Sequence, residues 1–158
     1  MIRSRTKLPL TLPLALTLVA VGCSPADAPD AAEVEATLEA VPAAPTRTVE
    51  IVSPANGSSI EGSEIRVVLQ VDGMMIRPAG DTTANSGHHH LYLDAELTDP
   101  AVPVPTVPGS IIHMGDGSSE YVFTDVAPGL HRIIAVVADF AHFPLQPWVT
   151  DTIEVMVR

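Results

Sequence analysis

Short stretches of alternating apolar and polar residues, separated by turn residues, follow one another from Arg47 to the C-terminus. In the clearest of them, Ile65, Val67, Leu69 and Val71 alternate with Arg66, Val68, Gln70 and Asp72. Alternation with a period of two predicts a strand that buries one face. Similar or shorter apolar runs predict further strands over residues 49–52, 88–95, 110–114, 120–124, 130–139 and 152–157. Seven or eight strands in about 110 residues predict an all-β fold, an immunoglobulin-like or fibronectin-type Greek-key β-sandwich over residues 47–158.

Three consecutive histidines begin the predicted strand 88–95. Because Leu91 and Leu93 are expected to face the core, His89 should share their side, and His88 and His90 should lie on the opposite side. A spacing of two residues on a strand places these two imidazoles about 7 Å apart, close enough to hold one ion with a third ligand.

Greek-key wiring predicts which other side chains reach this end of the sandwich. The strand 88–95 should lie antiparallel to the strand 130–139, so that its start meets Asp139 and His142. His113, at the end of the strand 110–114, should arrive at the same end. His131 begins the strand 130–139 and is therefore expected at the far end, in a structural role.

Imidazole is the commonest protein ligand for zinc and copper ions. The sequence therefore predicts a copper or zinc site, with metal ligands drawn from His88, His89, His90, His113, His142 and Asp139. Three methionines, Met74, Met75 and Met114, are expected at the same end and would favour copper.

Two alternatives remain open. The histidines could form a polar strand end in a structural or interaction domain of the cell envelope, with Asp139 as a turn cap. A metal-dependent enzyme would need an open coordination position. We expect no enzymatic activity, because the sequence has no nucleophile elbow, phosphate-binding glycine loop or CxxC pair.

The first 46 residues have a different character. Residues 1–22 combine a basic start with an apolar run, which is typical of an export signal. This segment ends in Ala20-Val21-Gly22, and Cys23 follows directly. The four residues together resemble a bacterial lipobox, which predicts lipidation of Cys23. Residues 23–46, rich in Ala, Pro and acids, predict a disordered linker. We therefore expect a periplasm-facing lipoprotein of the bacterial cell envelope, held at the outer membrane by its acyl chains.

The net charge of the chain limits the classes of partner that it can bind. Without residues 1–22 the chain keeps five arginines and no lysine against 19 acidic residues, so its formal charge is 5 − 19 = −14. Nucleic acid is excluded as a partner, because its binding needs clustered positive charge. A metal ion or an envelope protein remains possible.

Several of these motifs also occur together in a known family. The segments Gly87-His88-His89-His90-Leu91, Ile112-His113 followed by Gly115, Pro128-Gly129 before His131, and Asp139-x-x-His142 resemble a bacterial family catalogued as number 4399 of the domains of unknown function. The resemblance covers residues 49–158. It implies an exported small β domain and no particular activity. Family members often carry further His or Asn near the last motif, where this chain has Phe140, Phe143 and Leu145, which implies a drier and weaker site.

Overall fold

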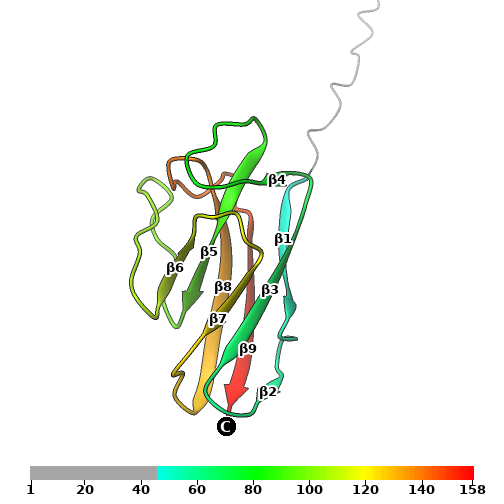
Figure 1. Ribbon diagram of the computed structural model, residues 1–158, viewed down its shortest axis with the longest axis vertical. Coiled ribbons are helices and arrows are strands. Elements are labelled where there is room, and N and C mark those ends of the chain that lie inside the picture. The colour runs from blue at the N-terminus through cyan, green and yellow to red at the C-terminus, as the bar shows by residue number, and fades with distance from the viewer. Residues whose placement is uncertain (1–45) are drawn as a thin grey trace, which may run out of the picture. The chain divides into compact units, whose positions relative to one another are not determined.

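The computed structural model describes residues 46–158, and within that range every regular element is a β-strand (Figure 1). Seven strands have four or more residues: β1 (Thr48–Ser53), β3 (Ile65–Asp72), β5 (Ser86–Leu93), β6 (Ile111–Met114), β7 (Glu120–Phe123), β8 (Gly129–Ala138) and β9 (Thr150–Val157). Each begins and ends within two residues of the strand predicted from the apolar pattern. The all-β prediction is confirmed.

Two further strands have only two residues each and were missed. These are β2 (Ser59–Ile60), parallel to the end of β9, and β4 (Met75–Ile76), parallel to the start of β5. The sequence analysis assigned both segments to connections. A two-residue strand has no alternation of its own, because it exists only through the partner beside it.

The strands form two sheets. One has the order β1-β3-β7, and the other has the order β2-β9-β8-β5-β4, with β6 also paired to β5. Alternating residues of β3 explain the packing, since Ile65 and Val67 are fully buried while Arg66 is exposed. They meet Leu91, Ile133 and other apolar residues of the second sheet in one core. Burying such a side chain contributes about 1.5–3 kcal/mol to the stability of the fold.

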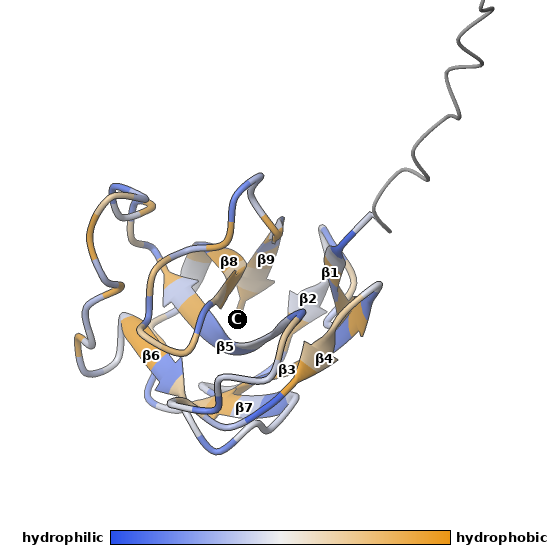
Figure 2. Cartoon of the chain, turned by 90° about the horizontal axis from the view of Figure 1, so that it is seen from above, coloured by the Kyte–Doolittle hydropathy of each residue, from blue (hydrophilic) through white to orange (hydrophobic). Residues whose placement is uncertain are grey.

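Strand β5 is buried on both faces, unlike β3. Its neighbour β8 runs antiparallel, with His88 opposite Ala138, which confirms the predicted pairing. The outer face of β5 and β8 is covered by the long connection between β5 and β6. Val104 of this connection packs against Tyr92 and Val136 in a second apolar cluster. Seen from above, that connection lies outside the sheet, on the side away from β1 and β3 (Figure 2).

The predicted signal segment 1–22, Cys23 and most of the predicted linker 23–46 lie outside the described residues. Within residues 46–158, no helix is long and apolar enough to cross a membrane.

Candidate metal centre

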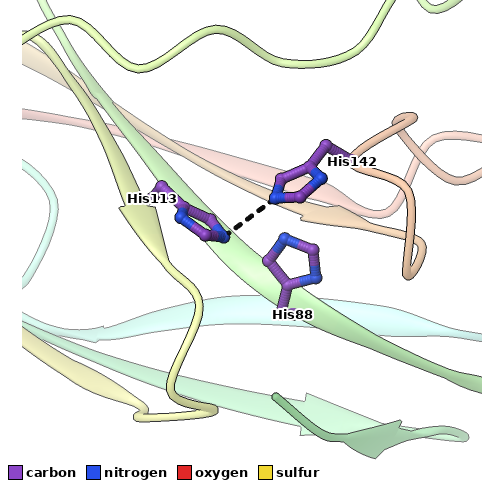
Figure 3. Close-up of side chains that lie close together, drawn as sticks. All are labelled: His88, His113 and His142. Carbon is purple, nitrogen blue, oxygen red and sulfur yellow. Dashed lines mark hydrogen bonds between the residues drawn. The ribbon is translucent and has the colours of Figure 1, made fainter. Parts of the chain in front are cut away.

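Four imidazoles gather on the outer face of β5, beneath the connection between β5 and β6. His88 and His90 project from β5, His113 lies opposite His90 on the neighbouring strand β6, and His142 comes from the loop after β8. We call these residues the four-histidine cluster. Figure 3 shows His88, His113 and His142 pointing toward one another from three separate elements.

The ring nitrogens of the cluster lie close to one another. The Nε2 atoms of His88 and His90 are 3.1 Å apart, and those of His113 and His142 are also 3.1 Å apart. Potential ligand nitrogens of His88, His113 and His142 all lie within 4.8 Å of one another. These three imidazoles could therefore hold a metal ion together.

Short hydrogen bonds hold the loop that carries His142. The Asp139 carboxylate accepts hydrogen bonds from the N–H groups of Ala141 and Phe143, each at 2.9 Å. The carbonyl of His142 accepts a 2.8 Å hydrogen bond from the N–H of Val104, in the connection that covers β5. His142 itself has a φ of 71°, a left-handed conformation that is uncommon outside glycine. The loop thus holds a costly backbone conformation at the residue that turns its imidazole inward.

A glycine makes room for His113. A Cβ atom at Gly115 would lie 2.3 Å from Cε1 and 2.5 Å from Nε2 of the His113 ring. Any larger residue at this position would push the ring away from the cluster. The sequence analysis included Gly115 in the family motif and gave it no role, because its effect depends on a ring that folds back over the following turn.

Burial and mutual repulsion lower the pKa values of three rings of the cluster, those of His88, His90 and His113. The pKa of His88 falls from 6.5 to about 4, mainly through loss of hydration and then through the neighbouring rings of His142 and His113. Loss of hydration, followed by the charge of His88, lowers the pKa of His90 to about 3. The pKa of His113 is also lowered, by burial and then by His142. At neutral pH these three imidazoles are neutral and can bind a metal ion without first losing a proton.

The buried rings are incompletely satisfied by the protein. Nδ1 of His88 and Nδ1 of His90 are buried and have no hydrogen-bond partner in the described part of the chain. Where two Nε2 atoms of neutral rings face each other, one carries a proton and donates a hydrogen bond, and the other accepts it with its lone pair. Leaving buried nitrogen atoms unpaired costs about 1–3 kcal/mol each. Such polar atoms are retained in a core where they serve another purpose.

Three groups of predicted ligands do not join the cluster. His89 faces the core between the sheets, where its Nδ1–H donates a 3.0 Å hydrogen bond to the carbonyl of Ser118. Asp139 caps the loop that carries His142, and its charge opposes the fall in the pKa of His88. The expectation was wrong for Met114 and Met74. Met114 is buried in the main core, because neighbours on a strand point to opposite faces, and Met74 packs against this core.

His131 lies apart from the cluster, near the start of β8. Its ring nitrogens contact Asp94 Oδ2 at 2.6 Å and the carbonyl of Ala127 at 2.7 Å. Both partners are acceptors, so the ring satisfies them fully only with two N–H groups, as an imidazolium. Burial acts to lower its pKa, but the hydrogen bonds to Asp94 and Ala127 outweigh burial and raise it above 6.5.

Comparisons with known proteins place the chain in a family. No curated protein is similar enough to match it. Among solved structures, the crystal structure of an engineered protein shares 14% identity with it at a TM-score of 0.42. That similarity covers 72% of this chain and 20% of the engineered one, so this chain spans about a fifth of that protein's length. A family model matches residues 67–158, from β3 to the end of β9 and including the whole four-histidine cluster. The chain belongs to the family described as Domain of unknown function (DUF4399).

Proposed function

We propose that this protein is a metal-binding module that holds one copper or zinc ion in the four-histidine cluster. The observation that carries the proposal is the pair of 3.1 Å separations between facing Nε2 atoms. Metal–nitrogen bonds of about 2.0–2.1 Å require ligand nitrogens about 3 Å apart, close to this spacing. The lowered pKa values support the same function, because imidazoles must be neutral to act as ligands.

The test is metal content. The purified chain, first stripped with a chelator, is incubated separately with Zn²⁺ and Cu²⁺, desalted and analysed for bound metal. We expect one ion per chain, and almost none in the double variant His113→Gln/His142→Asn. The control is His131→Gln, which removes a histidine outside the cluster and should keep the full metal content. Equal metal content in the chain and the double variant would end the proposal.

We also propose that the module is a bacterial lipoprotein, anchored in the outer membrane through acylated Cys23. The lipobox-like sequence before Cys23 supports this location, and several acyl chains would give a stable anchor. Labelling cells with radioactive palmitate should mark the chain and leave Cys23→Ala unlabelled. An unlabelled native chain would exclude the anchor and leave the metal site unaffected.

The Greek-key assignment belongs to the same proposal. The order β1-β3-β7 in one sheet and β9-β8-β5-β6 in the other supports an immunoglobulin-like or fibronectin-type sandwich. In this arrangement the short strand β6 joins the sheet of β5 rather than that of β7, as the extra strand of variable-type domains does.

The alternative function is an interaction domain that binds an envelope protein. One observation favours it: Phe140 and Phe143, on the loop that carries His142, are 49% and 37% exposed. Exposed aromatic residues are enriched at protein interfaces. This function predicts that Phe140→Ser/Phe143→Ser abolishes partner capture in cross-linking of whole cells, while the His113→Gln/His142→Asn variant keeps it.

A further inference from the structure

The four rings of the cluster are almost equally far from one another. The six distances between ring centroids are 4.9 Å (His88–His90), 5.0 Å (His88–His113), 4.9 Å (His88–His142), 5.2 Å (His90–His113), 5.8 Å (His90–His142) and 4.7 Å (His113–His142). Four points with six similar separations define a tetrahedron. A square would instead have two long diagonals.

Elementary geometry makes this comparison quantitative. With a metal–nitrogen bond of about 2.05 Å and a ring centroid about 1.1 Å behind Nε2, each centroid lies about 3.2 Å from the ion. A tetrahedral ion then separates all centroids by about 5.2 Å, whereas a square-planar ion gives four distances near 4.5 Å and two near 6.4 Å. The observed distances run only from 4.7 to 5.8 Å, and the longest falls short of a square diagonal, so their narrow spread matches the tetrahedron better than the square.

The rings need only a small movement to close on an ion. Tetrahedral coordination requires nitrogen separations of about 3.3 Å, which both 3.1 Å pairs nearly meet. The largest separation within the trio of His88, His113 and His142 is at most 4.8 Å, so these nitrogens must approach by up to about 1.5 Å. His113 and His142 are only half-buried, so their side chains have more room to turn than the fully buried rings of His88 and His90.

The type of ligand atom distinguishes between the metal ions that prefer tetrahedral coordination. Cu⁺ and Zn²⁺ both accept four ligands in a tetrahedron, but Cu⁺ favours soft sulfur ligands. Met74 and Met114 belong to the core between the sheets, on the opposite face of β5 from the cluster. The cluster therefore offers only imidazole nitrogen, which suits Zn²⁺, while Cu²⁺ prefers a square.

We propose, on the basis of the metal-binding function above, that the cluster takes a single Zn²⁺ ion in a closed tetrahedral site, with His88, His90, His113 and His142 all as ligands. A site with four protein ligands leaves no position for water or substrate, which is typical of structural zinc. The ion joins three elements that are otherwise held by separate contacts: β5, the short strand β6, and the loop that follows β8. Zinc therefore fastens β6 and the loop after β8 to β5.

Cobalt absorption tests the geometry, because Co²⁺ adopts the geometry of a zinc site and absorbs visible light strongly only when it is four-coordinate. The chelator-stripped chain is titrated with Co²⁺ and then with Zn²⁺. We expect intense absorption that saturates at one Co²⁺ per chain and disappears with one equivalent of Zn²⁺. His142→Asn, in which asparagine tolerates the left-handed backbone, should lose this absorption and bind Zn²⁺ about 100-fold more weakly. Phe140→Asn introduces the same residue at an exposed position of the same loop and should leave both unchanged.

X-ray absorption at the zinc edge gives a second, independent result, which does not depend on any variant folding. It should show four nitrogen ligands at about 2.0 Å. Weak six-coordinate Co²⁺ absorption, or zinc with five or six ligands, would overturn the closed tetrahedral site. Binding of Cu²⁺ with a square-planar spin-resonance spectrum, together with no binding of Zn²⁺, would overturn this inference and leave the metal-binding function intact. Failure to bind any of these ions would remove both.

Discussion

The four-histidine cluster and His131 place the same side chain in opposite surroundings. In the cluster, burial lowers the pKa values of His88, His90 and His113, and the neighbouring imidazoles lower them further, so these three rings are neutral at neutral pH. At His131, the ring lies between a carboxylate and a carbonyl, so its pKa rises and the charged form is favoured. The difference shows that the neighbours of a histidine, and not its burial alone, decide whether it can serve as a ligand or as a hydrogen-bonded support.

The largest expected effect is the loss of metal affinity when the two buried histidines of the cluster are replaced. In the variant His88→Leu/His90→Leu, apolar side chains replace two fully buried imidazoles. We expect metal affinity to fall by well over 100-fold, because two of four ligands are lost, which exceeds the ten- to hundredfold effect of groups that only support ligands. Isothermal titration with Zn²⁺ measures the change. An affinity within tenfold of the native value would show that these rings are not ligands.

Lowering the pH should change the stability contributions of the cluster and of His131 in opposite directions. A group with a lowered folded-state pKa stabilises the fold above its unfolded value of about 6.5 and loses this contribution as pH falls. For His88 and His90 the loss extends from pH 6.5 down to about 4 and about 3, and is on the order of a few kcal/mol. Urea unfolding of the metal-free chain between pH 7.5 and 4.5 should therefore show falling stability, and His88→Leu/His90→Leu should flatten the slope.

His131 should behave in the opposite way in the same experiment. Its raised pKa stabilises the fold fully below pH 6.5, and this contribution is lost as pH rises through the folded-state value. His131→Gln should therefore lose most stability at low pH and least at high pH. If both variants changed the pH profile in the same direction, the contrast between the two regions would be wrong.

A smaller effect should come from Gly115→Ala, which keeps every ligand. The added Cβ would overlap the His113 ring, so the ring must move and metal affinity should fall by about 10- to 100-fold, as for other changes that misplace a ligand. Ser119→Ala, in the same turn, adds no atoms and is the control. Unchanged zinc affinity in Gly115→Ala, measured beside this control, would show that the position of the His113 ring is unimportant.

The smallest effect should come from Asp94→Asn, which weakens the support of His131 without touching the cluster. The carboxylate also accepts a 2.9 Å hydrogen bond from the N–H of Arg132. Asp94 is about half exposed, so solvent screens the ion pair, and we expect a loss of about 1 kcal/mol in unfolding free energy with no change in zinc affinity. A change in zinc affinity would show that the two regions are coupled.

Periodic patterns were sufficient to predict most of the fold. Alternation in β3 and β9 and the apolar run of β8 gave these strands nearly their observed bounds, and the expected antiparallel pairing of β5 with β8 placed His88 beside the end of β8, as observed. The gathering of the imidazoles was predicted for the same reason. A choice of partner that carries no periodic signal could not be predicted, as in the pairing of β6 with β5 and the short strands β2 and β4.

Side-chain detail was less predictable from sequence. Alternation alone placed His89 away from His88 and His90, and the structure agrees. The same rule, applied to His113 and Met114, would have removed Met114 from the site. Full burial of His88 and His90 was not predicted, because the proline-containing connection shows no pattern that indicates which face of the sheet it covers. The close approach of Gly115 to a ring is likewise invisible until the ring is placed.

The hydrogen bond from the N–H of Val104 to the carbonyl of His142 links the proline-containing connection to the loop that carries a ligand. Anything that steadies His142 should therefore also steady this connection, which is a long exposed stretch open to protease attack. The rate of protease cleavage within residues 95–110 would then measure the fraction of molecules that carry a metal ion. Limited proteolysis in cell extracts could follow loading of the protein without purification.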